Sequence, residues 1–100
     1  MGKAHTMERM EKKEIEQALV QLDGWTFQGG SIVKDFEFKD FREAFSAMCR
    51  IAFECEAQNH HPDWGNVYNS LTIALNTHEV GGVTAKDFKL AKSIEKVLEK

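Results

Sequence analysis

The stretch that decides the fold is residues 25–38, which read Trp25-Thr26-Phe27-Gln28-Gly29-Gly30-Ser31-Ile32-Val33-Lys34-Asp35-Phe36-Glu37-Phe38. Two runs of β-prone residues flank the Gly-Gly pair, and a tight two-residue hairpin turn needs the positive φ angles that glycine adopts easily. Phe36 and Phe38 alternate with two acidic residues, so one face of the second strand is apolar and the other is polar. The stretch therefore predicts an antiparallel hairpin with one face in solvent.

Three stretches around this hairpin have apolar residues at helical spacing, and they cover residues 8–22, 41–58 and 85–98. The first ends at Asp23-Gly24, as glycine after a helix end predicts. The last begins after the capping residue Thr84. The apolar positions predicted to face the core are Ile15, Ala18, Leu19 and Leu22 in the first helix and Phe88, Ala91, Ile94 and Leu98 in the last.

The longest helix, residues 41–58, is predicted to begin after Asp40 with Glu43 as its capping-box partner. One apolar stripe runs through Phe41, Phe45, Met48, Ala52 and Cys55, with Ala44 and Ile51 beside it. Ala47, Cys49 and Phe53 fall off that stripe. Two interpretations stay open: either the helix has a wide core face, or its second apolar side is buried by another subunit.

A second pair of strands is predicted at residues 64–68 and 71–77, linked across Asn69-Ser70. In the latter strand, Leu71, Ile73 and Leu75 face one way, while Thr72, Ala74, Asn76 and His78 face the other. Gly81-Gly82 then predicts a turn. The element order is α-β-β-α-β-β-α, which predicts an α+β fold with a four-stranded antiparallel sheet and three helices on one face. Residues 1–100 form a single domain in this interpretation, with residues 1–7 as a loose tail.

Composition narrows the function classes. The 100 residues contain 42% hydrophobic and 29% charged side chains with a net charge of −3, which is typical of one globular domain. The chain has no basic stripe for direct nucleic-acid binding, no apolar run of about 18 residues for a membrane span, and no hydrophobic signal core. Cys49 and Cys55 lie about 9 Å apart along one predicted helix, too far for a disulfide, so a reduced intracellular chain is expected.

Three of the four histidines fall between residues 56 and 87, and His5 lies alone in the tail. His60 and His61 follow the long helix, and Pro62 prevents its continuation. His78 comes at the end of the next strand but one, so hairpin geometry predicts that it lies near the His-His corner. Imidazoles with an ordinary pKa of about 6.5 can donate or accept protons near neutral pH. The pattern predicts a small acid–base site, to which Glu56, Tyr68 and Asp87 also belong.

Each of these residues has a simpler interpretation. The His-His corner could cap helix carbonyls, and Asp87 could serve only the first turn of the last helix. Trp64 and Tyr68 could be packing residues, and Glu56 a solvated carboxylate. Three histidines with an acid could also bind zinc, although adjacent histidines without a cysteine are not a standard structural zinc spacing.

The ordered spacing distinguishes these alternatives. Glu56, His60-His61-Pro62, Tyr68, His78 and Asp87 stand at intervals that resemble the signature of the pterin-4a-carbinolamine dehydratase family. The resemblance extends from about residue 14 to residue 98, and it includes the runs Asn66-Val67-Tyr68-Asn69 and Thr77-His78-Glu79.

The resemblance implies a hydro-lyase of tetrahydrobiopterin recycling. Family members eliminate water from the 4a-hydroxytetrahydropterin that aromatic amino-acid hydroxylation leaves, and they form quinonoid dihydropterin. No metal or organic cofactor is implied, and the implied location is the cytoplasm.

Carried over residue by residue, the resemblance implies that His60 and His78 are general acids facing the leaving hydroxyl. His61 would mainly hold the substrate, and Pro62 would shape the corner. Residues implied to line the pterin site around His78 are Thr77, Glu79 and Val80, and those implied to orient histidines or the pterin ring are Glu56 and Asp87. Asn59 stands where some relatives carry Asp, and Val80 where some carry Cys.

The resemblance also implies partners. Family members form homodimers or homotetramers, and helix 41–58 is implied as the contact. Some double as dimerisation cofactors of a homeodomain transcription factor, which would add a nuclear location. The alternative function is therefore an oligomeric protein-binding module, a transcriptional coactivator whose enzymatic activity is vestigial or secondary.

Overall fold

A computed structural model describes residues 8–99, so the predicted tail and His5 lie outside the described residues. The elements follow in the order α1 (Lys12–Leu19), β1 (Thr26–Gln28), β2 (Ser31–Glu37), α2 (Phe41–Gln58), β3 (Asp63–Val67), β4 (Ser70–Leu75), the 3-10 helix η2 (His78–Val80) and α3 (Ala85–Val97). The predicted α+β order is confirmed.

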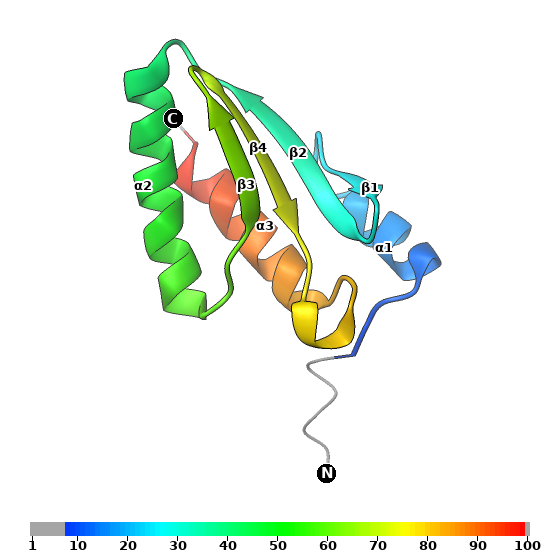
Figure 1. Cartoon of the computed structure of the whole chain (residues 1–100). Coiled ribbons are helices and arrows are strands. Elements are labelled where there is room, and N and C mark those ends of the chain that lie inside the picture. Colours follow the sequence, from blue (N-terminus) through cyan, green and yellow to red (C-terminus); the bar gives the residue numbers. More distant parts are fainter. Residues whose placement is uncertain (1–7, 100) are drawn as a thin grey trace.

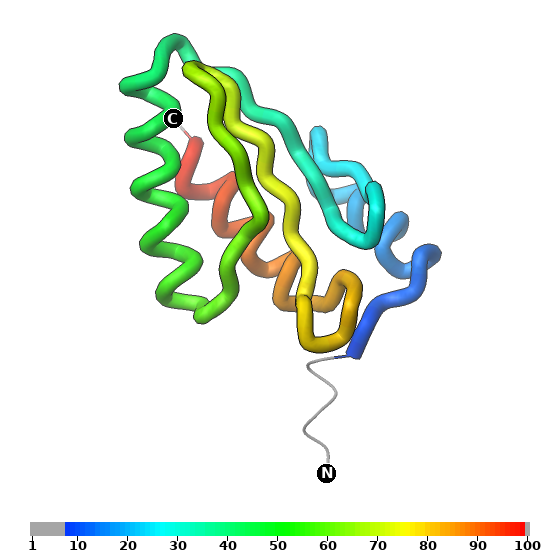
Figure 2. Tube along the Cα trace, in the orientation of Figure 1, coloured from blue at the N-terminus to red at the C-terminus, as the bar shows by residue number. Residues whose placement is uncertain are grey.

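The four strands form one antiparallel sheet in the order β1-β2-β4-β3, as Figure 1 shows. Gln28 pairs with Ser31 across Gly29 and Gly30, whose φ angles are 57° and 84°. The predicted Gly-Gly hairpin is therefore confirmed. The trace in Figure 2 shows how the long α2 connects β2 to the other hairpin, so that β4 pairs with β2 in the middle of the sheet.

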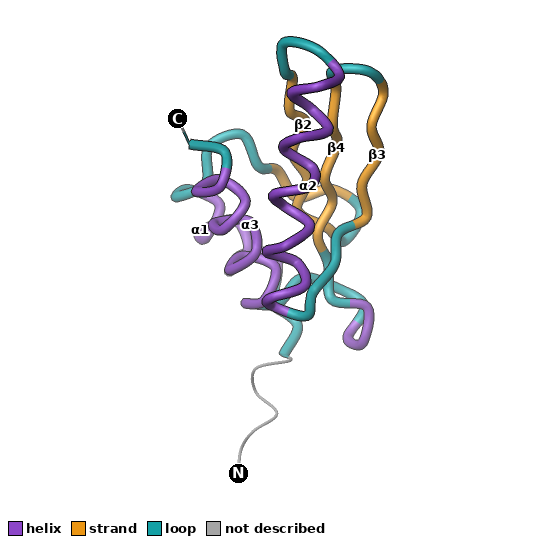
Figure 3. The backbone as a smooth tube through the Cα atoms, turned by 90° about the vertical axis from the view of Figure 1, so that its left-hand side faces the viewer, coloured by secondary structure: helices purple, strands orange, loops and turns teal. Residues whose placement is uncertain are grey.

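The helices pack on one face of the sheet, which Figure 3 shows from the side. Leu71, Ile73 and Leu75 of β4 are fully buried beneath them. The opposite face of the sheet is exposed at Asp35 and Thr72, as the alternation of polar residues predicts. Among the described residues, no helix combines the length and apolarity that a membrane span needs.

Helix α1 is shorter than predicted. It begins after Glu11, whose backbone N–H bonds the Glu14 side chain, while Met10 already bonds the backbone of Val83. After Leu19 the chain continues in tighter i→i+3 turns as far as Leu22, which is buried. The apolar spacing therefore persists beyond the regular helix, which explains the overestimated length.

Helix α2 has the predicted bounds, but its buried stripe is not the predicted one. The buried positions are Ala44, Ala47, Ile51 and Cys55. Phe41 and Phe45 are about half exposed, at 47% and 53%, and Phe53 is 74% exposed. Three of these four residues are small and let α2 approach its neighbours closely, Ile51 fills the core, and the aromatic residues of α2 remain largely outside.

The cap of α2 also differs from the prediction in one bond. Asp40 Oδ1 accepts the backbone N–H of Glu43, as expected of an N-cap. The Glu43 carboxylate accepts the N–H of Lys39 instead of that of Asp40, so the reciprocal half of the predicted capping box is displaced by one residue.

The second hairpin turns one residue earlier than predicted. Val67 pairs with Ser70, so the turn residues are Tyr68 and Asn69, and Tyr68 has a φ of 53°. Strand β4 ends at Leu75, before the predicted Thr77. Thr77 forms an isolated bridge to Gly82, and His78 begins η2.

Candidate active site

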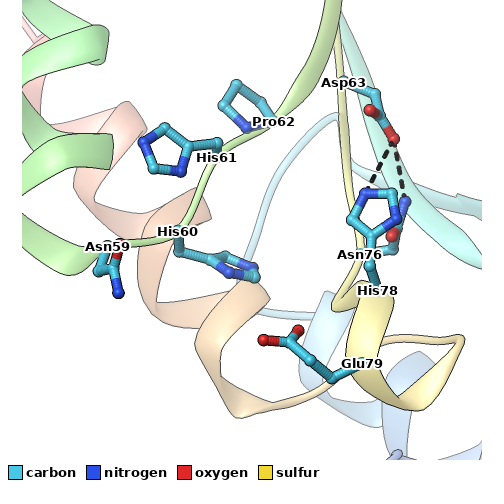
Figure 4. A pocket seen from close by; sticks show the side chains of 8 residues that line it. All are labelled: Asn59, His60, His61, Pro62, Asp63, Asn76, His78 and Glu79. Carbon is cyan, nitrogen blue, oxygen red and sulfur yellow. Dashed lines mark hydrogen bonds and ion pairs between the residues drawn. The ribbon is translucent and has the colours of Figure 1, made fainter.

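A cavity of about 340 Å³ opens at the end of the sheet where α2 ends, β3 begins and α3 begins. Two chain segments line it, residues 59–63 and a second segment that contributes Asn76, His78 and Glu79. Figure 4 shows the residues that line the cavity, which are Asn59, His60, His61, Pro62, Asp63, Asn76, His78 and Glu79. All three histidines of the predicted site therefore meet around one cavity.

The end of α2 places His60. Asn59 adopts a left-handed conformation with a φ of 52°, and its N–H and that of His60 bond the last helical carbonyls. The reversal turns His60 inwards, where its side chain is only 9% exposed. Its Nε2 lies 2.5 Å from Asp87 Oδ1 at the start of α3. Because a carboxylate accepts hydrogen bonds, we assign the proton to His60 Nε2.

Asp87 is fully buried and has two functions in the structure. Its Oδ2 accepts the backbone N–H of Thr84, which closes a capping box at the start of α3. The same oxygen accepts the hydroxyl of Thr77, and Oδ1 faces His60. The helix N-terminus further favours a negative charge at this position. Asp87 is thus more than the cap that its spacing from Thr84 predicts.

His61 turns the other way, towards α2. Its Nε2 lies 2.6 Å from Oε2 of Glu56, which is in the last turn of that helix. Both side chains are exposed, at 54% for His61 and 75% for Glu56. Pro62 follows and leads the chain into β3, so the two neighbouring histidines have different carboxylate partners in different environments.

The opposite wall of the cavity carries His78 at the start of η2. Its Nε2 lies 3.9 Å from Asp63 Oδ2, the first residue of β3. Asn76 donates to the same carboxylate oxygen at 3.2 Å and to Ser31 Oγ at 2.9 Å. Figure 4 shows Asp63, Asn76 and His78 on one wall, and the Glu79 carboxylate points towards the space next to His60. His78 itself is 75% exposed, so a bound molecule could reach it.

The structure separates three predicted site residues from the cavity. Tyr68 lies in the β3–β4 turn at the far end of the hairpin, and its side chain is 62% exposed. Thr77 and Val80 flank His78 and Glu79 but do not line the cavity, and Thr77 is fully buried. The contact of Thr77 and Val80 with a pterin stays a prediction.

Sequence reasoning did not assign Asp63 and Asn76 to the site. The signal was present in the alternation of β4, which puts Asn76 on the same side as His78, and in the start of the strand directly after His-His-Pro. Antiparallel pairing of Asp63 with Ala74 then brings the carboxylate beside Asn76.

This arrangement can perform acid–base chemistry on one small molecule. His60 and His78 approach the cavity from different chain segments, and each has a carboxylate beside it. Two proton-transfer groups on separate walls can act on two atoms of the same bound ring. Within residues 8–99, no three His, Cys, Asp or Glu side chains gather closely enough to hold a metal ion.

Known proteins resemble this chain over nearly its full length. Residues 8–97 match the family described as pterin 4 alpha carbinolamine dehydratase. A candidate pterin-4-alpha-carbinolamine dehydratase of Christiangramia forsetii is 54% identical over 93 residues, which cover 93% of this chain and 96% of that protein. Another candidate, from Rhizobium johnstonii, is 49% identical, and the match covers 90% of this chain and 91% of the relative.

A solved structure agrees with these sequence matches. The crystal structure of a transcriptional coactivator/pterin dehydratase from Brucella melitensis superimposes with a TM-score of 0.88 at 37% identity. The match covers 92% of this chain and all of the Brucella chain. The fold, the order of the elements and the sequence matches agree, and the chain belongs to the pterin-4a-carbinolamine dehydratase family.

Proposed function

We propose that this chain is a hydro-lyase that removes water from a 4a-hydroxytetrahydropterin and leaves quinonoid dihydropterin, a step of tetrahydrobiopterin recycling. The observation that carries the proposal is the meeting of His60 and His78 at one cavity from two separate chain segments. The family of the chain supports the same reaction.

The reaction needs two proton transfers. The bond from C4a to the hydroxyl oxygen breaks, and the oxygen takes a proton from a general acid and leaves as water. A ring nitrogen next to C4a loses its proton to a general base, and a carbon–nitrogen double bond forms. The electron pair of the C–O bond leaves with the oxygen and that of the N–H bond forms the new double bond, so the step is redox-neutral and positioned imidazoles suffice for the proton transfers.

We assign the proton transfers to His60 and His78. Asp87 holds the His60 ring with its Nε2 protonated, so the other ring nitrogen is available to the substrate. His61 and Pro62 form the adjoining wall, and Glu79 offers a carboxylate that can accept hydrogen bonds from the amino and ring N–H groups of a pterin. Glu56 orients His61 from outside the cavity.

A dehydration assay tests this proposal. The 4a-hydroxytetrahydropterin is generated in situ, and formation of quinonoid dihydropterin is followed by absorbance with and without the protein. Acceleration by the native chain that is lost in His78→Ala and kept in Tyr68→Phe is expected, because Tyr68 lies at the other end of the hairpin. Undiminished acceleration by a folded His60→Ala/His78→Ala double variant would refute the assignment.

A second candidate function rests on the outer face of α2. Phe41, Phe45 and Phe53 are exposed there, and Cys49 lies among them. We include in the proposal that this face joins copies of the chain into a homodimer or homotetramer, or binds a transcription-factor partner. The exposed thiol of Cys49 fits a reducing compartment, and we place the protein in the cytoplasm, with a nuclear location tied to the partner role.

A further inference from the structure

Thr77 lies next to the catalytic His78 in the sequence, but its side chain points away from the cavity and is fully buried. We propose that Thr77 is a positioning residue that acts on His60 through Asp87, instead of a residue that binds the substrate with its side chain. The inference rests on the proposed dehydratase function for its kinetic consequence only. The hydrogen bonds from Thr77 through Asp87 to His60 do not depend on which molecule binds.

The hydrogen bonds around Asp87 fix the direction of every hydroxyl proton. The carboxylate only accepts, so the Thr77 hydroxyl must donate to Asp87 Oδ2, 2.9 Å away. Thr77 Oγ1 then has to be the acceptor in its 2.8 Å contact with Thr84 Oγ1. Thr84 Oγ1 in turn accepts the backbone N–H of Lys86 at 3.2 Å. One chain of donors therefore runs from the first turn of α3 to the carboxylate.

The other end of the chain reaches His60. Two donors, the Thr77 hydroxyl and the Thr84 N–H, hold Oδ2, which leaves Oδ1 aimed at His60 Nε2. No buried side-chain nitrogen or oxygen in residues 8–99 lacks a hydrogen-bond partner. His60 Nδ1 has no hydrogen-bond partner in the described part of the chain. It therefore cannot be one of the buried atoms, and it is accessible from the cavity that His60 lines. The network thus selects which ring nitrogen faces the substrate.

Thr77 also connects the two walls of the cavity. Its backbone N–H bonds Gly82 O at 2.7 Å, and its carbonyl accepts N–H groups from Val80 and Gly81, which closes the turn that carries His78. Its hydroxyl meanwhile reaches the Asp87–His60 pair on the other wall. The Thr77 backbone therefore positions His78, and its hydroxyl positions His60 through Asp87. Loss of the hydroxyl is expected to disturb only His60.

The test compares Thr77→Val with Thr84→Val in the full chain. Both substitutions replace threonine with valine and remove a buried hydroxyl of one network, and Thr84→Val also removes the side chain that caps α3. Only Thr77 touches Asp87 with its hydroxyl, because Thr84 contacts that carboxylate through its backbone N–H. Thr77→Ser keeps the hydroxyl and serves as the rescue variant, and Thr77→Ala replaces the valine variant if the latter does not fold.

The expected result is a fall of about tenfold in kcat for Thr77→Val with KM within about twofold, and nearly native kcat for Thr77→Ser and Thr84→Val. The ¹⁵N and ¹H NMR signals of the His60 ring should shift in Thr77→Val and stay in place in Thr84→Val. A rise in KM at constant kcat would mean that the side chain binds the pterin, and equal losses of kcat in both valine variants would mean a general packing defect. Either result overturns the inference.

The NMR measurement separates this inference from the proposed function. If the native protein does not accelerate dehydration, the proposed function fails, and the His60 ring signals alone decide the role of Thr77. Ring signals that are unchanged in Thr77→Val would overturn the inference whatever the activity.

Discussion

A fully buried carboxylate is costly unless several donors satisfy it, and Asp87 has three, from His60, Thr77 and Thr84. The spacing Thr84-x-x-Asp87 predicts one of these contacts, the cap of α3. The contact with His60 spans 27 residues and depends on how the end of α2 packs beside α3, so no local pattern could predict it. The family resemblance, in contrast, implies a supporting role for this position.

We predict that Asp87→Asn lowers turnover by at least about tenfold while keeping most of the α3 cap. The amide oxygen can still accept the Thr84 N–H, but the NH₂ group then faces His60 Nε2 and favours the opposite tautomer. Mispairing of buried donors should also cost about 1–3 kcal/mol of unfolding free energy. Steady-state kinetics and urea unfolding measure both effects. Asp35→Asn, at an exposed carboxylate on the open face of the sheet, should change neither.

The two cysteines differ in reactivity. Cys49 is exposed, whereas Cys55 is 2% exposed, and burial raises the pKa of the Cys55 thiol to about 11. We predict that iodoacetamide at pH 8 adds one group to the native protein and none to Cys49→Ser, because the reactive species is the thiolate. Intact-protein mass spectrometry counts the adducts. Two adducts on the native fold would contradict the burial of Cys55.

The same thiol should make stability depend on pH. The pKa of Cys55 rises from 9.0 to about 11 on folding, so between these values the folded state keeps a proton that the unfolded state loses. The stability that the protonated Cys55 thiol contributes is therefore fully present below pH 9 and is lost as the pH rises towards 11. At pH 10 the unfolding free energy is lower by about 1–2 kcal/mol. The loss is measured as the difference in unfolding free energy between the native protein and Cys55→Ala, which removes the contribution of lysine titration. A constant difference from pH 8 to pH 10 would contradict it.

Turns and helix ends place the site residues, and they are also where the sequence was hardest to interpret. The Gly29-Gly30 pair predicted the first turn correctly, because glycine tolerates a positive φ. Tyr68 adopts a positive φ as well, but tyrosine is no turn signal, and its β propensity extended the predicted strand by one residue. At the other end of β4, alternation predicted that His78 follows Asn76 onto one side. Both meet Asp63 there, although the strand had already ended.

The two alanine variants Gly30→Ala and Gly65→Ala should separate backbone strain from contact. At both positions an added methyl meets no atom of residues 8–99 within 4 Å, but Gly30 has a φ of 84° and Gly65 lies in β3 with ordinary strand geometry. We predict that Gly30→Ala loses about 1–2 kcal/mol of unfolding free energy. Gly65→Ala should be neutral or slightly stabilising, as chemical denaturation would measure. Equal effects would mean that the φ angle at the turn does not matter.

The outer face of α2, with Phe41, Phe45 and Phe53, is not covered by any other part of the described chain. Apolar residues on more than one side of that helix left open either a wide core face or a second surface buried by another subunit, and periodicity could not tell which side faces the sheet. The predicted stripe contained both Cys55, which is buried, and Phe41 and Phe45, which are about half exposed. The Phe41 and Phe45 rings stack with centroids 5.7 Å apart. The face turned to the core combines three small residues, which let α2 lie close to its neighbours, with the fully buried Ile51.

We predict that the native chain is an oligomer and that Phe45→Glu/Phe53→Glu converts it to a monomer that remains folded, having lost only the stabilisation that association supplies. Both phenylalanines are exposed in the single chain, so their loss costs little within one subunit. Light scattering coupled to size-exclusion chromatography at micromolar concentration gives the mass. Val20→Glu is the control, since Val20 is 80% exposed outside α2. A monomeric native protein would refute the proposed assembly.

The shared use of Asp87 also bears on how this protein can evolve. A substitution that loosens the grip on His60 also loosens the start of the third helix, so selection cannot change this wall of the cavity without endangering the fold. His78 and Glu79 on the opposite wall are exposed on a single short turn, so substituting either side chain does not remove a helix cap. Substitutions that alter substrate preference should therefore be tolerated better on the η2 turn than in the wall behind His60.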